Sequence, residues 1–277
     1  MTNSACSGSS FTSTPANVTN GVVPAGTTYS WSAPVVTGGM TGGTSGTAAA
    51  SITGTLINPT NTPQTATYTV TATSGTAPNQ CSNAFTLTVT VNPTPAVSSM
   101  TNSACSGSSF TSTPANVTNG VVPSGTTYSW SVPVVTGGMT GGSSGTGASS
   151  VTGTLTNPTN VAQMATYTVT PTSGTCSGTT FNVSITINPL PTFTTSTLNP
   201  SLCGSNNGSI TLSGLNSTSS YVLNYLDDGN LVGPISINNP VGGVYVIPGL
   251  NAGGYSNIII NDGTCNSNAA NLSLSDP

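Results

Sequence analysis

The 277-residue sequence has no lysine, arginine or histidine and only four acidic residues, which gives a formal net charge of −4. About a quarter of the residues in an average soluble domain are charged, whereas here the share is 1%. Without histidine or lysine, the chain cannot form a Ser-His-Asp or Cys-His catalytic arrangement, a Schiff-base lysine or a histidine metal site. Without basic side chains it has nothing to neutralise phosphates, so we expect no nucleic-acid partner. We therefore predict a protein that is not an enzyme, with no catalytic residue, cofactor or metal ligand.

Long apolar runs and strong helix formers are also scarce. No stretch approaches the roughly 18 apolar residues of a membrane-spanning helix, and no basic, apolar leader opens the sequence. The most conspicuous residues are 52 threonines, 33 glycines and 20 prolines. Thr, Gly and Pro disfavour helices, whereas Thr, Val, Tyr and Ile suit strands. The composition predicts an all-β protein.

The chain contains a long internal repeat. Residues 1–75 match residues 100–174 at 64 of 75 positions. The copies end in N-P-T-P and N-P-L-P, and such paired prolines are typical of short, stiff linkers. Both copies therefore read as structural units of one kind joined by a proline-rich connection.

A third unit with another composition follows. Only three of the 52 threonines lie after residue 198, and all four acids do: Asp227, Asp228, Asp262 and Asp276. We predict three domains, at residues 1–95, 96–191 and 192–277. The first repeat starts at Met1, the equivalent of Met100, without the residues that Ala96 to Ser99 provide ahead of the second repeat. We therefore expect a window from a longer repeat array, with a complete protein starting at a true initiator methionine as the alternative.

Alternating apolar and Thr/Ser residues mark the strands. Tyr29 and Trp31 alternate with hydroxyl residues, as do the apolar residues of segments 67–71, 85–91 and 181–187. In the third unit we expect strands at residues 209–213, 221–226, 243–247, 255–260 and 271–275, with a turn at Asp228-Gly229. One apolar face and one Thr/Ser face per strand indicate antiparallel β-sandwich sheets.

The six cysteines fall two to a unit. They are Cys6 and Cys81, Cys105 and Cys176, and Cys203 and Cys265. Sequence alone permits 15 connectivities. The placement favours one disulfide inside each unit, Cys6–Cys81, Cys105–Cys176 and Cys203–Cys265, and disulfides indicate a compartment outside the reducing cytoplasm.

The first two units resemble the PKD-like, immunoglobulin-like repeats of giant secreted surface proteins of Bacteroidota. The features that carry this resemblance are the early cysteine, the Y-S-W-S strand, A-T-Y-T-V-T followed by S-G-T and the second cysteine, and a last strand ending V-N-P-T-P or I-N-P-L-P. The resemblance implies tandem immunoglobulin-like sandwiches in a linear array, exported to the cell surface as a stalk, adhesin or fibre. The Asp of the W-x-F-G-D-G segment found in many PKD domains is absent, so no calcium role is carried over.

The third unit is similar to the short repeats of gliding-motility-type surface adhesins. C-G-S-N-N-G-S-I-T-L-S-G-L opens this unit, Tyr221 and Tyr225 lie in its middle, and G-L-N-A-G-G-Y-S-N-I precedes D-G-T-C. This resemblance also implies a surface adhesin.

Two sharper site hypotheses compete with structural explanations. Trp31 and Trp130 are either platforms for stacking sugars or core residues packed against a disulfide, as in immunoglobulin-like sandwiches. Asp227, Asp228 and Asp262 either bind calcium, which requires six to eight oxygen ligands, or shape turns. We favour the core and turn interpretations.

The two functional hypotheses belong to different classes. We favour an extracellular structural or adhesive repeat protein that forms a cell-surface stalk, fibre or filament. The alternative is an array of carbohydrate-binding modules that presents or anchors a distant enzyme, which exposed coplanar aromatics would support. The expected partners are copies or neighbouring repeats of the same array, with surface glycans as a further candidate.

The near absence of charge bears on assembly. Edge strands are normally protected by charged side chains, and this chain has almost none. An unpaired edge of the first repeat could accept a strand from another chain, so we expect fibres or a surface layer that salt hardly affects.

Overall fold

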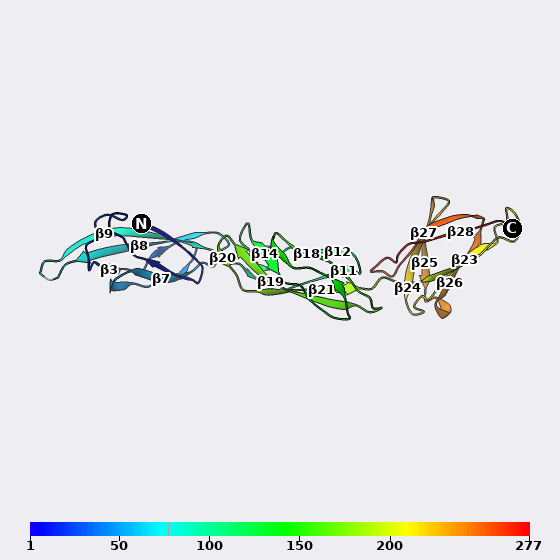
Figure 1. Cartoon of the computed structure of the whole chain (residues 1–277), viewed down its shortest axis with the longest axis horizontal. Helices are drawn as coiled ribbons and strands as arrows, with labels where there is room; N and C mark the ends of the chain where they lie inside the picture. Colours follow the sequence, from blue (N-terminus) through cyan, green and yellow to red (C-terminus); the bar gives the residue numbers. More distant parts are fainter. Residues whose placement is uncertain (77) are drawn as a thin grey trace.

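Three β-rich units follow one another along an elongated molecule in the computed structural model, which describes residues 1–76 and 78–277 (Figure 1). Each unit has a hydrophobic core of its own. We call them the first repeat (strands β1 to β9), the second repeat (β10 to β21) and the third unit (β22 to β28).

The strands have the following bounds. The first repeat contains β1 (Thr2–Cys6), β2 (Ser10–Ser13), β3 (Thr28–Trp31), β4 (Val35–Val36), β5 (Thr41–Gly42), β6 (Gly46–Ala49), β7 (Ile52–Ile57), β8 (Gln64–Ser74) and β9 (Cys81–Asn92). The second repeat contains β10 (Ala96–Val97), β11 (Met100–Cys105), β12 (Ser109–Ser112), β13 (Gly120–Val121), β14 (Thr127–Trp130), β15 (Val134–Val135), β16 (Thr140–Gly141), β17 (Gly145–Ala148), β18 (Val151–Thr156), β19 (Gln163–Ser173), β20 (Cys176–Ser177) and β21 (Phe181–Asn188). The third unit contains β22 (Thr194–Leu198), β23 (Gly208–Ser213), β24 (Ser220–Asp227), β25 (Asn230–Asn238), the 3-10 turn η1 (Val241–Gly243), β26 (Val244–Leu250), β27 (Gly253–Asn261) and β28 (Ala270–Leu274).

The predicted all-β class is confirmed, and no α-helix occurs in residues 1–76 and 78–277. Alternation decides which side chains are buried: Leu87, Val89 and Val91 of β9 are fully buried, and the threonines between them are at least partly exposed. Burying the apolar half of each strand supplies the main folding energy, about 25 cal/mol per Å² of apolar surface. None of the helical segments in the described residues is long and apolar enough to cross a membrane.

Each repeat is a two-layer sandwich. In the first repeat, one sheet has the order β1-β9-β8-β3-β6, with β4 on β8, and the other has the order β2-β7-β5. The second repeat reproduces this arrangement with β11-β21-β19-β14-β17 and β12-β18-β16. The pairings are antiparallel except for β1 with β9 and β11 with β21, which are parallel. The first and last strands of a repeat therefore run side by side in the same direction.

The third unit is a separate sandwich with sheets β22-β23-β26 and β25-β24-β27-β28. All five strands expected here from alternation are present, with ends that differ by one to three residues. The predicted turn joins β24 to β25, where Asp228 and Gly229 both have positive φ, as a type I′ hairpin turn requires.

Both tryptophans are core residues. Trp31 and Trp130 are each 8% exposed. The ring nitrogen of Trp31 donates a 2.9 Å hydrogen bond to the main-chain oxygen of Thr44, and a Cβ built on Gly46 would lie 2.2 Å from the ring. Glycine is therefore required there by the close approach of the indole.

The linker ahead of the second repeat is part of that repeat. Ala96 and Val97 form β10, which pairs with β13, and Val97 belongs to the second core at 8% exposure. Pro95 packs so closely that a Cβ on Gly178 would lie 2.0 Å from its carbonyl oxygen. Among the described residues of the first repeat, no strand pairs with the equivalent residues, and Val22 is 90% exposed.

Candidate functional site at the junctions between units

The disulfides connect neighbouring units. Cys6 of the first repeat is bonded to Cys176 of the second, with Cα atoms 5.5 Å apart, and Cys105 of the second repeat is bonded to Cys265 of the third unit, with Cα atoms 5.7 Å apart. Cys81 and Cys203 are exposed free thiols. The predicted pairs Cys6–Cys81, Cys105–Cys176 and Cys203–Cys265 are therefore wrong.

The parallel strand pair explains why a bond within one repeat does not form. Cys6 ends β1 opposite Asn92, the last residue of β9, whereas Cys81 is the first residue of β9. A strand of 12 residues spans about 35 Å, so the two cysteines of one repeat lie at opposite poles. Disulfide geometry allows only about 4.4 to 6.8 Å between Cα atoms. The first cysteine of a repeat consequently faces the next unit.

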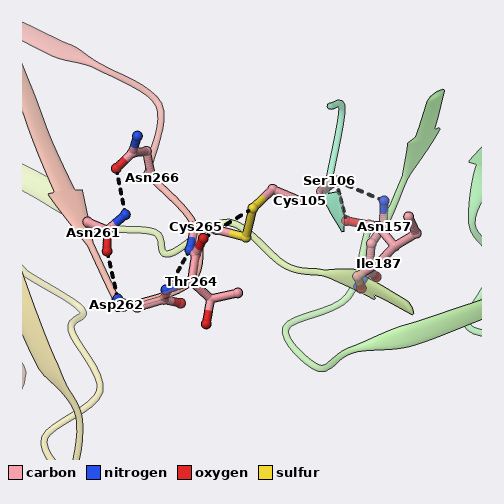
Figure 2. Close-up of a disulfide and its surroundings, with 10 residues drawn as sticks. Cys105, Ser106, Asn157, Ile187, Asn261, Asp262, Thr264, Cys265 and Asn266 are labelled. Atoms are coloured by element: carbon pink, nitrogen blue, oxygen red, sulfur yellow. Dashed lines mark hydrogen bonds between the residues drawn. A yellow bond between two sulfur atoms is a disulfide. The ribbon is translucent and has the colours of Figure 1, made fainter. Parts of the chain in front are cut away.

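A hydrogen-bonded loop presents Cys105 to the third unit (Figure 2). The amide of Ser106 donates to the main-chain oxygen of Asn188 at 2.8 Å, and the Ser106 hydroxyl accepts a 2.9 Å bond from the amide of Asn157. The Asn157 side chain is buried and donates to the main-chain oxygens of Ile187 and Val161, at 2.9 and 2.8 Å. These contacts anchor the cysteine loop to the end of β21.

A tight turn holds Cys265 on the other side of this junction. One carboxylate oxygen of Asp262 accepts hydrogen bonds from the main-chain amides of Thr264 and Cys265, at 2.9 and 2.8 Å (Figure 2). The Asn261 side chain donates to that of Asn266 at 2.8 Å. The Thr264 carbonyl oxygen lies 3.5 Å from the Cys105 sulfur, and Cys265 is 1% exposed. The turn therefore places a buried sulfur at the pole that faces the second repeat.

The junction between the first and second repeats is built in the same way. Ser7 and Asn58 repeat the contacts of Ser106 and Asn157, and Asn58 donates to the main-chain oxygen of Val91 at 2.9 Å. Thr94 of the linker donates to the main-chain oxygen of Ser7 at 3.1 Å. Cys176, at the start of β20, is 1% exposed. Each junction thus has two covalent connections, a proline linker and a disulfide.

The other candidate residues have structural positions. Trp31 and Trp130 are too buried to stack a sugar. Asp228 accepts the Gly254 amide at 2.7 Å, Asp262 caps the cysteine turn, and Asp227 lies at the end of β24. Within residues 1–76 and 78–277, no cluster of three His, Cys, Asp or Glu residues is close enough to hold a metal ion.

Two core tyrosines are unusual. Tyr68 and Tyr167 are fully buried, and neither hydroxyl has a hydrogen-bond partner among the residues that the structure describes. Burial disfavours the phenolate, so it raises the pKa of both side chains.

The sequence alone did not reveal that two buried asparagines hold the junction loops in place. It also did not reveal which neighbouring unit each cysteine faces. Asn58 and Asn157 lie in N-P-T-N segments, which read as turns. The available signal for the cysteines was their order: the second cysteine immediately precedes the last strand, and the N-P linker follows that strand. The pole of the second cysteine could be inferred from this order, but that of the first depends on the parallel β1–β9 pairing.

A comparison with protein families places the two repeats. Residues 3–95 and 102–191 each match the model of the PKD-like domain. No curated protein matches the chain.

The solved structures that the chain is similar to include two cell-adhesion proteins and one glucan-utilization protein, all at low identity. The FN1–FN3 domains of chicken CNTN1 align over 90% of both chains with 11% identity and a TM-score of 0.32. The N-terminal eight Ig domains of Down Syndrome Cell Adhesion Molecule align with 99% of this chain and 35% of that one, with 10% identity and a TM-score of 0.32. SGBP-B from the Bacteroides ovatus mixed-linkage glucan utilization locus aligns with 98% of this chain and 66% of that one, with 12% identity and a TM-score of 0.21.

Proposed function

Because the chain belongs to the PKD-like domain family, and because disulfides join its consecutive units, we propose that it is a load-bearing extracellular array: a stalk or fibre of the cell surface. The junction disulfides carry this proposal. They also support a location outside the reducing cytoplasm, where such bonds persist.

The covalent connections of the second repeat favour mechanical strength. Tension from the first repeat enters the second repeat through Cys176. It passes on to the third unit through β21 and the linker at Pro191. A second path enters through the linker at Pro95 and leaves through β11 and Cys105, which is bonded to Cys265. Since β11 and β21 are paired in parallel, two extended strands lie side by side along both paths. The segment between Cys105 and Cys176 is outside the load path.

This arrangement limits how far a repeat can lengthen. A reduced repeat of about 90 residues, pulled to about 3.4 Å per residue, should gain roughly 250 Å when it unfolds. In the oxidised repeat the short path along β21 is already extended, so the gain should be below about 30 Å. A stalk of such units would hold its length under force even when a sandwich is transiently disrupted.

Single-molecule pulling between the two chain ends tests the proposal. The reduced chain should show two unfolding steps of roughly 250 Å from the two repeats, and the oxidised chain should show neither. The double variant Cys6→Ser/Cys105→Ser, under oxidising conditions, is the matched control and should restore both steps. Long steps in the oxidised parent chain would contradict a load-bearing role for the junction disulfides.

Carbohydrate binding has less support as the main role. Most of the aromatic side chains that could stack on a sugar are buried in the cores, including both tryptophans. Adhesion to a partner at the tip of the array is compatible with the stalk role, because a stalk presents whatever its end carries.

A further inference from the structure

The two disulfides follow one rule. In each, the first cysteine of a unit is bonded to the second cysteine of the next unit: Cys6 to Cys176, and Cys105 to Cys265. By the same order, Cys203 is a first cysteine and Cys81 is a second cysteine, and both thiols are exposed and free among the residues that the structure describes. The two free thiols therefore have complementary roles.

A cavity lies beside Cys81 in the first repeat. It has a volume of about 400 Å³, and its lining includes Val22, Val23, Tyr29, Phe85 and Cys81. Val22 is 90% exposed, and Phe85 is only partly buried. Apolar side chains of a sandwich are thus accessible at the pole that carries the thiol.

The second repeat shows what occupies this position in a completed junction. There the linker from the preceding unit lies across the equivalent residues, with β10 on β13 and Val97 in the core. Phe181, the equivalent of Phe85, is 4% exposed, and Cys176, the equivalent of Cys81, is 1% exposed and bonded to the preceding unit. The cavity of the first repeat lies at the position that β10 and Val97 cover in the second repeat.

The opposite pole of the molecule carries the other thiol. Cys203 lies in the loop after β22, and the amide of the adjoining Gly204 donates to Asp276 near the C-terminal end of the chain, which Figure 1 places at the far pole from the first repeat. Leu202, next to Cys203, is 69% exposed, and Leu198 is 64% exposed. This pole therefore offers a cysteine with apolar side chains close to it, and the cavity beside Cys81 has apolar side chains such as Val22 and Phe85 in its lining.

We propose that copies of this chain join head to tail, with the Leu202-Cys203 pole of one copy docked on the Val22 cavity of the next and a disulfide between Cys203 and Cys81. The disulfide continues the pattern of the junction between the first and second repeats, in which a first cysteine is bonded to the second cysteine of the next unit. This inference goes beyond the stalk role, which needs only the two disulfides inside the chain.

The bond forms by thiol–disulfide exchange with a small disulfide such as oxidised glutathione. The Cys203 thiol loses its proton and attacks the disulfide, which gives a mixed disulfide and releases one glutathione thiol. The Cys81 thiolate of the next copy then attacks the Cys203 sulfur and releases the second glutathione thiol. Two protein thiols are oxidised to one disulfide, and one glutathione disulfide is reduced to two thiols.

The test uses the full chain with a glutathione redox buffer. Non-reducing electrophoresis should show a ladder of covalent oligomers, and peptic mapping should identify Cys81–Cys203 peptides. Cys81→Ser and Cys203→Ser should each stop the ladder at dimers at most. An equimolar mixture of these two variants should give the mixed dimer in preference to either homodimer.

Two controls separate docking from random thiol pairing. Val22→Asp and Leu202→Asp should each slow formation of the bond about tenfold, because a buried unpaired charge opposes docking. Val134→Asp, at a site that is 77% exposed in the second repeat, should leave the rate unchanged. The double variant Cys81→Ser/Val134→Cys keeps two exposed thiols, at positions 134 and 203. It should form no ladder of oligomers, because position 134 lies outside the proposed docking site.

Some outcomes would overturn the inference without touching the stalk role. These are monomers that keep both thiols free in the redox buffer, or oligomers joined equally through Cys81–Cys81 and Cys203–Cys203 pairs. Either result would mean that a second copy of this chain does not occupy the docking site. The pulling experiment on the single chain would be unaffected.

Discussion

The side-chain nitrogen of Asn58 lies 2.9 Å from the main-chain oxygen of Val91, at the end of β9. The same side chain donates to Thr62 at 2.8 Å, and its oxygen accepts the amide and the hydroxyl of Thr60. Asn157 makes the equivalent contacts in the second repeat. The buried side chain thus joins a turn to the last strand, and the main-chain amide of the same residue donates to the Ser7 hydroxyl of the cysteine loop.

Removing this anchor should destabilise a repeat. We expect Asn157→Ala to lower the free energy of unfolding by about 2 to 3 kcal/mol, because it leaves buried backbone groups without partners. Asn182→Ala, at an exposed position on β21, is the control and should change it by less than about 0.5 kcal/mol. Chemical denaturation monitored by Trp fluorescence measures both. Equal effects of the two substitutions would show that the buried network has no special role.

The connectivity can be checked with a single protease site. The chain has no Lys or Arg, so trypsin should leave it uncut, and Thr192→Arg adds one site at an exposed linker residue between the second repeat and the third unit. After trypsin, the two fragments should stay together without reductant because Cys105–Cys265 bridges the cut. They should separate after reduction. Separation of the unreduced fragments would mean that the bonds lie within units after all.

Stability should fall at alkaline pH. The pKa values of Tyr68 and Tyr167 are raised by burial above the unfolded value of about 10, so above that pH the unfolded state loses protons that the folded state retains. The contribution is complete below about pH 10 and is lost as pH rises through the folded pKa values. Melting temperatures measured by circular dichroism should therefore be flat from about pH 7 to 9 and then decline.

The double variant Tyr68→Phe/Tyr167→Phe tests the assignment. Its alkaline decline should be shallower, and its stability at pH 7 should be no lower, because the hydroxyls that it removes have no hydrogen-bond partner among the described residues. A decline identical to that of the parent chain would exclude these tyrosines as the source.

Salt should have little effect on stability. Four acidic side chains and no basic ones leave almost no ion pairs to screen. Between about 0.05 and 1 M sodium chloride we expect the melting temperature to change by less than about 2 °C, and any assembled fibres to persist. Fibres that dissolve as salt rises would point to charge-based contacts.

Local patterns in the sequence predicted the strands well. The alternation in β9 and β21, the buried tryptophans and the Asp228-Gly229 hairpin each depend on neighbouring residues, and each is confirmed. The disulfides failed because their geometry depends on a long-range pairing: whether β1 runs parallel or antiparallel to β9 decides which pole carries Cys6. Two cysteines in one repeat indicate nothing about this direction.

The linker ahead of the second repeat could be predicted only in part from the sequence. The sequence suggested that Ala96 to Ser99 begin the first strand of the second repeat, but Ala96 and Val97 form a separate strand, β10, and the strand equivalent to β1 starts at Met100. It did not reveal that Val97 enters the core or that Gly120 must lie against Ala96, because these contacts depend on the approach of two chain segments 20 or more residues apart.

The pairing of a proline linker with a disulfide at each junction also affects rotation. Units joined by one flexible connection can rotate freely about it. Units joined at two separated points can rotate relative to one another only about the axis through those two points. The Pro93–Pro95 linker and the Cys6–Cys176 bond are two such points. A twist applied to one unit must therefore pass to the next, and the azimuth of each unit about the long axis is set by its neighbour. Surface residues at matching positions would then recur at fixed angles along an array, which makes it a shaft that transmits torque.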